Sequence, residues 1–111
     1  KNRVIQVLSH VGLSHKRNQL PHELSGGEQQ RVVIARAIIN EPWIILADEP
    51  TGNLDPTVAD QIQKLLIGLN RSGMTVLMAT HDYRLVRNYP SRTLAVMNKR
   101  IVEVDPRSLS S

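Results

Sequence analysis

The 111-residue sequence contains no cysteine and no phenylalanine, and its only aromatic residues are Trp43, Tyr83 and Tyr89. The absence of cysteine excludes disulfide scaffolds, zinc–cysteine sites and cysteine nucleophiles. So few aromatic side chains argue against a surface that stacks on nucleobases or sugars. The core must therefore come from Leu, Val and Ile, which favours a buried sheet covered by helices.

The sequence also lacks any apolar run of the roughly 20 residues that a membrane-spanning helix needs, and no signal peptide opens it. We therefore expect a soluble, cytoplasmic protein. The net charge is +4, but the basic residues are scattered, so we expect no nucleic-acid partner. The acidic residues are less evenly spread, because Asp48, Glu49, Asp55 and Asp60 lie within thirteen positions.

Apolar spacing and cap residues predict the helices. The i, i+3, i+4, i+7 spacing of apolar residues predicts an amphipathic helix over 3–11, followed by an irregular stretch over 13–24. Ser25 and Glu28 form the S-x-x-E capping box of a helix that extends to about residue 39. Asp55 followed by proline begins a further helix that ends near Ser72.

Continuous apolar runs at 43–47 and 74–79 are typical of strands buried on both faces. A short helix over 82–88 and a hairpin of strands 93–97 and 100–104 follow, and the tail over 106–111 has no predicted structure. This order predicts an α/β fold with a mostly parallel sheet, flanking helices and a C-terminal β-hairpin.

Polar residues follow both buried strands at their carboxyl ends, where ligands bind to parallel sheets. Asp48 and Glu49 end the first strand, and His81 follows the second, so we expect the three on one rim. A carboxylate there can hold Mg²⁺ through water, and its neighbour can polarise an attacking water. Taken singly, the two acids are more typical of a solvated loop, and His81 is more typical of a surface or hydrogen-bonded histidine than of a catalytic one.

The segment Leu24-Ser25-Gly26-Gly27-Glu28 places two glycines in the first turn of a helix. The unpaired N–H groups of that turn and the helix dipole favour an anion such as phosphate. Ser25 and Glu28 could simply cap the helix, and Asp55 could do the same for the next one. A cap does not account for two glycines, each of which costs a helix up to about 1 kcal/mol.

Four segments, taken together and in order, resemble the motifs of ABC-type ATPases. LSGGEQQ (24–30), WIILADEP (43–50), TGNLD (51–55) and MATHD (78–82) resemble the signature motif, Walker B, the D-loop and the switch histidine. The resemblance covers nearly the whole chain but only about the C-terminal half of a family member. Within the family the strings look most like the cell-division ATP-binding proteins, with lipoprotein-releasing and macrolide-export subunits as close competitors.

The resemblance implies a P-loop NTPase-like fold, ATP and Mg²⁺ as cofactors, and a role for each matching residue. Asp48 supports Mg²⁺, Glu49 is the general base, and His81 contacts the γ-phosphate. The nucleotide-binding residues are Ser25, Gly26, Gly27 and Glu28 of the signature and Asp55 of the D-loop. In the family, the signature acts on ATP bound to the opposite protomer, so that two ATP molecules lie in a head-to-tail dimer.

The phosphate-binding motif G-x-x-x-x-G-K-[ST] does not occur in the sequence. We therefore expect this chain not to hold ATP alone and interpret it as a piece of a longer ATPase. Residues 1–40 would end a helical subdomain, 41–105 would form the C-terminal part of the catalytic core, and 106–111 would be a tail. The implied partners are a second ATPase protomer and an integral membrane subunit at the inner face of the cell membrane.

Without the strand that carries the missing motif, segments 74–79 and 93–104 would keep unpaired edges. We therefore expect the chain either to self-associate or to pair its hairpin with 74–79.

Two other classes of protein remain open as readings of this sequence. A DNA-repair ATPase of the same superfamily should carry heptad repeats or zinc cysteines before the signature. A non-catalytic regulatory module is compatible with the missing motif, although the retained Glu49 and His81 argue against it.

Overall fold

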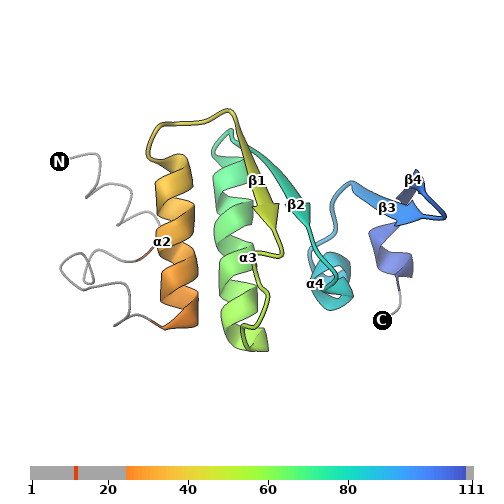
Figure 1. Cartoon of the computed structure of the whole chain (residues 1–111), viewed down its shortest axis with the longest axis horizontal. Helices are drawn as coiled ribbons and strands as arrows, with labels where there is room; N and C mark the ends of the chain where they lie inside the picture. The colour runs from red at the N-terminus through yellow and green to blue at the C-terminus, as the bar shows by residue number, and fades with distance from the viewer. Residues whose placement is uncertain (1–11, 13–24, 110–111) are drawn as a thin grey trace. The chain divides into compact units, whose positions relative to one another are not determined.

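The computed structural model describes Gly12 and residues 25–109 (Figure 1). The predicted helix over 3–11 and the irregular stretch over 13–24 lie outside the described residues. The chain divides after Ala79 into two compact units. Within the described part of the chain, no helix is both long and apolar enough to cross a membrane.

The first unit contains helix α2 (Gly26–Ile38), which begins at the predicted capping box. The Ser25 hydroxyl oxygen accepts a hydrogen bond from the Glu28 backbone N–H at 3.1 Å. The Glu28 carboxylate in turn accepts one from the Ser25 backbone N–H, also at 3.1 Å. Two N–H groups that the helix cannot satisfy are thereby paired, which fixes where α2 starts.

Helix α3 (Pro56–Arg71) begins and ends where the sequence predicts. Asp55 Oδ1 accepts from the Val58 backbone N–H at 2.9 Å, and Pro56 occupies the first helical position. The chain leaves the helix through Ser72 and Gly73, whose φ of +109° suits a residue without a side chain.

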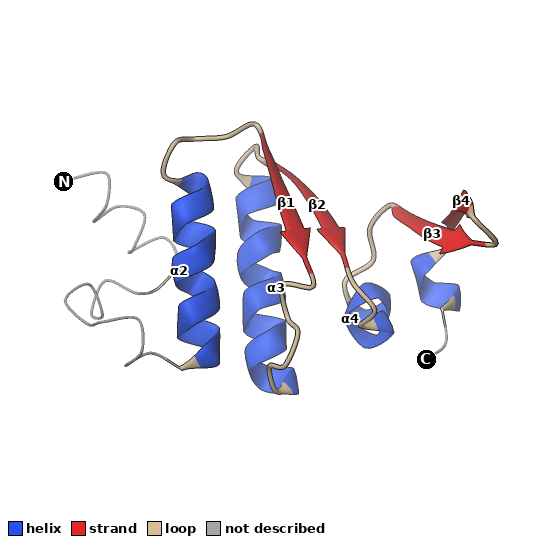
Figure 2. Ribbon diagram, in the orientation of Figure 1, coloured by secondary structure: helices blue, strands red, loops and turns tan. Residues whose placement is uncertain are grey.

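Strands β1 (Ile44–Asp48) and β2 (Thr75–Ala79) form a two-stranded parallel sheet (Figure 2). Ile45 pairs with Val76, and Asp48 pairs with Ala79. Both helices and β1 contribute to one buried hydrophobic cluster, in which Ile62 is fully buried. The cluster consists of Ile34, Ala35, Ile38, Ile45, Ile62, Leu66 and Leu69. The sheet and helices thus form the α/β architecture that the sequence predicts.

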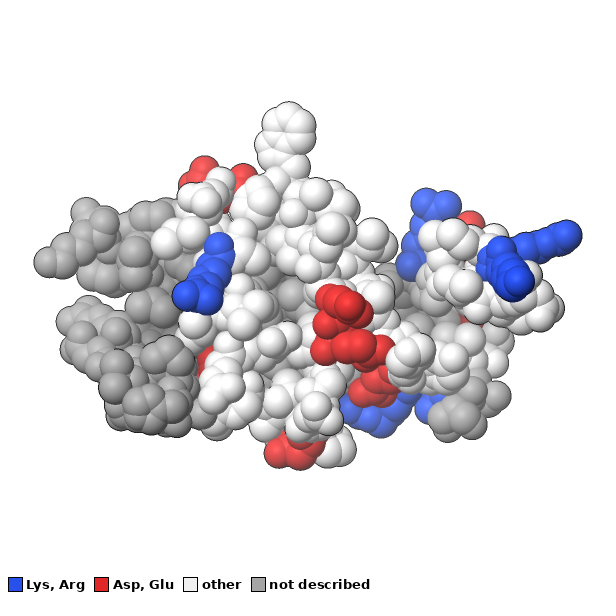
Figure 3. All heavy atoms as spheres, in the orientation of Figure 1, with Lys and Arg blue, Asp and Glu red and all other residues white. Residues whose placement is uncertain are grey.

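The prediction that both strands are buried on both faces is wrong. Side chains alternate along the strands, and those of Ile45, Val76 and Met78 pack into the core. The alternate positions are open, with Ile44 49%, Leu46 73% and Leu77 59% exposed. In Figure 3 most of the surface over β1 and β2 is accordingly white, although the exposed Asp48 at the end of β1 is charged. Helices that pack into one cluster can cover only one face of a sheet, so an apolar run does not guarantee two covered faces.

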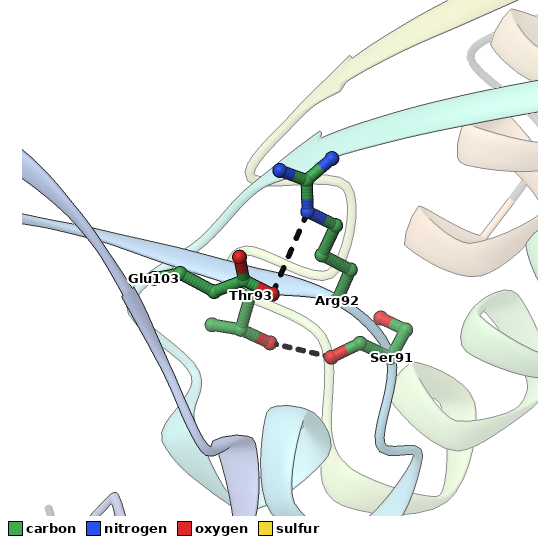
Figure 4. Close-up of polar contacts among 4 residues, drawn as sticks. All are labelled: Ser91, Arg92, Thr93 and Glu103. Atoms are coloured by element: carbon green, nitrogen blue, oxygen red, sulfur yellow. Dashed lines mark hydrogen bonds and ion pairs between the residues drawn. The ribbon is translucent and has the colours of Figure 1, made fainter.

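The second unit contains α4 (Tyr83–Asn88) and the hairpin of β3 (Thr93–Met97) and β4 (Arg100–Val104), as predicted. Asn98 and Lys99 connect the strands with φ of 50° and 63°, the left-handed pair that a two-residue hairpin turn requires. An exposed ion pair joins Arg92 Nε to Glu103 Oε2 at 3.6 Å (Figure 4). Exposed pairs of this kind contribute little to stability.

One expectation for the C-terminal region is wrong. Residues 106–108 are not an unstructured tail but a 3₁₀ turn, η3 (Pro106–Ser108), capped by Asp105. The same aspartate–proline pair starts α3, so the signal was present in the sequence. Strands β1–β2 and β3–β4 form separate two-stranded sheets in the described chain. The expectation that the chain either self-associates or pairs its hairpin with 74–79 stays a prediction.

Candidate functional site

The carboxyl end of β1 presents the two acidic residues of the predicted site. Asp48 is the last residue of the strand and is exposed, and Glu49 is half-buried. The Glu49 backbone N–H donates to the Ala79 carbonyl at 2.7 Å, so the ladder between the two strands extends one residue beyond β1.

Glu49 lies in an unusual backbone conformation, with φ of 48°. This left-handed region costs a residue with a side chain about 1–2 kcal/mol, so the surrounding structure must hold it. The Glu49 carbonyl accepts from the Gly52 N–H at 3.0 Å, and the Thr51 carbonyl accepts from the Leu54 N–H at 3.2 Å. These bonds close a tight turn immediately after the strand.

A third bond ties this turn to helix α2. Gln30 Nε2 donates to the Pro50 carbonyl at 2.7 Å, although the two residues are twenty positions apart in the sequence. Pro50 and Thr51 are both buried, so packing of these two residues also stabilises the turn. No pattern in the sequence predicts this role for Gln30. Its place inside the segment LSGGEQQ was the available signal, but no spacing rule connects it to Pro50.

The first turn of α2 lies against the residues that follow β1. A Cβ atom on Gly26 would lie 3.2 Å from Leu54 Cδ2, and one on Gly27 would lie 2.5 Å from Val58 Cγ1. Gly27 is therefore required by packing, because an atom at that distance cannot be accommodated without movement. Packing against Val58 is thus a reason for glycine at position 27 besides the approach of an anion, and the nucleotide-binding role of Gly27 stays a prediction. Ser25 and Gly26 are exposed, and Gly27 is buried.

Asp55 and Glu28 have the structural roles that the sequence analysis considered for them. Asp55 is exposed and caps α3, and Glu28 completes the capping box of α2. Packing of Gly26 on Leu54 brings the start of α2 close to the segment that leads into α3. The first unit thus gathers five predicted nucleotide-binding residues and the turn that carries Glu49.

His81 lies in the second unit, two residues after the end of β2, and its side chain is exposed. Its carbonyl accepts from the Tyr83 N–H at 3.0 Å at the start of α4. Asp82 caps that helix by accepting from the Leu85 N–H at 3.2 Å. The prediction that His81 shares a rim with Asp48 and Glu49 stays a prediction.

Asp48 is a carboxylate that fits Mg²⁺ held together with a nucleotide. Among the described residues, no three His, Cys, Asp or Glu side chains form a metal-binding group. Mg²⁺ keeps several waters and takes only one or two carboxylates when phosphate oxygens complete its shell. Asp48, exposed at the end of β1, is a carboxylate of that kind.

Comparison with known proteins supports the resemblance to ABC-type ATPases. The family model described as ABC transporter matches residues 1–52, a range that contains the signature segment, Asp48 and Glu49. The chain is 54% identical over 109 residues to the cell division ATP-binding protein FtsE of Mycobacterium tuberculosis, covering 97% of this chain and 47% of the relative. It is 49% identical over 107 residues to FtsE of Bacillus subtilis, covering 96% of this chain and 47% of the relative.

Solved structures agree. The chain matches cbiO1 of Clostridium perfringens, part of the ABC transporter complex cbiONQ, with a TM-score of 0.88 and 33% identity. That match covers 96% of this chain and 43% of the other. A nucleotide-free ATP-binding cassette from an ABC transporter matches with a TM-score of 0.87 and 30% identity, covering 94% and 42%.

The fold is that of part of an ATP-binding cassette, and over nearly its whole length the chain is similar in sequence to ABC-type ATPases. Among these proteins it is similar to the cell division ATP-binding proteins FtsE at about half of all positions. The chain spans about half the length of the curated relatives it matches.

Proposed function

We propose that this chain is the C-terminal part of an ATPase subunit that hydrolyses ATP in a head-to-tail dimer and drives a membrane complex of cell division. One observation carries the proposal. In the first unit, the start of α2, the turn after β1 and the start of α3 contact one another through Gly26, Gly27 and Gln30. Three motifs separated in the sequence therefore belong to one small region.

Within this proposal, Glu49 is the general base. A carboxylate can accept a proton from the attacking water, and half-burial together with the closed turn holds it in one place. Asp48 would hold Mg²⁺, which bridges phosphate oxygens and neutralises the charge that develops on them. His81 would contact the γ-phosphate from the carboxyl end of β2.

The exposed start of α2 would act on ATP bound to a second protomer. The exposed first turn of α2, which contains Gly26, presents the positive end of a helix dipole to the outside of this unit, and Ser25 is exposed beside it with its own N–H bound to Glu28. Gly27 and Glu28 hold that turn in place, through packing and through the capping box respectively. Asp55, exposed at the start of α3, would reach across the same interface.

The remaining assignments follow from the family. Residues 1–40 would end the helical subdomain, 41–105 would belong to the catalytic core, and 106–111 would form its C-terminal extension. The partners would be a second copy of the ATPase and an integral membrane subunit, at the cytoplasmic face of the cell membrane. The phosphate-binding loop would come from residues outside this sequence.

The test is the ATPase activity of the longer protein that carries this chain, compared with its Glu49→Gln variant. The amide keeps the shape of the side chain but cannot accept a proton, so turnover should fall by at least about 100-fold while ATP binding is kept. Glu103→Gln, the same change on the exposed hairpin, is the matched control and should leave turnover unchanged. Hydrolysis by Glu49→Gln within a few-fold of wild type would remove Glu49 from this role.

A further inference from the structure

We propose that Gln30 is a positioning residue that holds the catalytic turn at Glu49 through its hydrogen bond to Pro50. This inference rests on the function proposed above and adds a residue to the site. Gln30 does not touch a reacting group. It acts on the backbone of the residue that follows Glu49.

The geometry gives Gln30 a specific task. Glu49 must keep φ at 48°, a conformation that a glutamate does not hold without support. The Glu49 N–H and carbonyl are both bound, to Ala79 and Gly52. Pro50 has no N–H group, so its carbonyl is its one backbone hydrogen-bonding group. Gln30 Nε2 donates to that carbonyl at 2.7 Å.

The Gln30 donor belongs to a different element of the fold than the groups that form the other hydrogen bonds of the turn. The bonds from Gly52 and Leu54 lie within the turn, and the bond to Ala79 comes from β2, whereas Gln30 belongs to α2. Helix α2 also carries Ser25 and Gly26 at its start. Gln30 therefore connects the helix proposed to contact a partner's nucleotide with the turn proposed to act on the chain's own nucleotide.

The bond also requires a particular side chain. The Pro50 carbonyl is an acceptor, so residue 30 needs a side chain that carries a hydrogen-bond donor and is long enough to reach it. Methionine has nearly the length of glutamine but cannot donate, and glutamate would place a second acceptor against the carbonyl. Both variants preserve helix propensity, because Met, Gln and Glu are similar in a helix.

The experiment compares Gln30→Met with a matched control in the longer protein. Asn70 Nδ2 donates to the Met74 carbonyl at 2.9 Å, so Asn70→Leu removes the same kind of bond at the end of α3, away from Glu49. We expect Gln30→Met to lower kcat for ATP hydrolysis by about 10- to 100-fold with KM for ATP within about twofold. Asn70→Leu should keep kcat within about twofold, with a similar shift in thermal midpoint.

Amide hydrogen exchange gives a second readout that does not depend on activity. The Gly52 and Leu54 N–H groups should exchange faster in Gln30→Met than in wild type and remain unchanged in Asn70→Leu. A Gln30→Met variant with wild-type kcat and unchanged exchange would overturn the inference. If the wild-type protein did not hydrolyse ATP, or if Glu49→Gln kept its activity, the proposed function would fail instead.

Discussion

Gly27 on α2 and Val58 on α3 set how closely the two helices approach, because a Cβ atom on Gly27 would lie 2.5 Å from Val58 Cγ1. The glycine therefore allows the signature turn to pack directly on the start of α3. A residue that resembles part of a nucleotide-binding motif has a packing role of its own.

Gly27→Ala should destabilise the chain by about 1–2 kcal/mol, because the cost of overpacking exceeds the gain in helix propensity. The penalty should shrink in a Val58→Ala background, which removes the clashing methyl group. Urea unfolding measures both effects. Gly68→Ala is the control, since a Cβ there meets nothing within 4 Å and should stabilise α3 by about 0.5–1 kcal/mol. Equal effects at 27 and 68 would contradict the packing role.

Lys99→Gly should stabilise the hairpin. Lys99 has φ of 63°, which is unfavourable for a residue with a Cβ, and glycine adopts it without cost. We expect a gain of up to about 1 kcal/mol after the greater freedom of glycine in the unfolded chain is subtracted. Thermal unfolding measures the change. Asn98→Gly should gain less, because asparagine tolerates this conformation. A loss of stability in Lys99→Gly would show that the turn is not strained.

The chain expressed alone should self-associate. The sheet face with Ile44, Leu46 and Leu77 is apolar and exposed, and surfaces of this kind drive association. Leu46→Lys should shift the population toward monomer in sedimentation or light scattering. Val33→Lys, which changes an exposed residue of α2 (56% exposed), is the control and should have little effect. A wild-type chain that stays monomeric at all concentrations would disprove this prediction.

The chain expressed alone should also bind ATP·Mg²⁺ weakly or not at all. The backbone of the phosphate-binding loop supplies most of the contacts to the phosphates, and the motif for that loop does not occur in this sequence. Isothermal titration calorimetry measures the affinity. A dissociation constant in the micromolar range would mean that the residues described above form a nucleotide site without the loop.

The sequence predicted the helices, strands and turns well because their signals are local. The capping box at Ser25, the aspartate–proline pair at Asp55 and the Asn98-Lys99 turn each act within a few residues. The sequence-based predictions failed for features that depend on contacts with residues distant in the sequence. Burial of Ile44 and Leu46 depends on which face the helices cover, and the roles of Gly27 and Gln30 depend on contacts with Val58 and Pro50. None of these contacts is periodic in the sequence.

The most direct test of the account asks whether Glu49 of one protomer works with Ser25 of its partner. Two inactive variants of the longer protein are mixed: Glu49→Gln, and Ser25→Asp, which keeps a helix cap but repels phosphate. In a head-to-tail dimer, each mixed dimer combines both defects in one site and leaves the other intact.

ATP hydrolysis by an equal mixture of the two variants is the measurement. The account predicts recovery of about a quarter of the wild-type rate, since half of the dimers are mixed and each has one intact site of two. Each variant alone should stay inactive, while binding of ATP to the Ser25→Asp monomer stays close to wild type. A mixture no more active than its components would contradict the account, because Glu49 and Ser25 would then belong to the same site of one protomer.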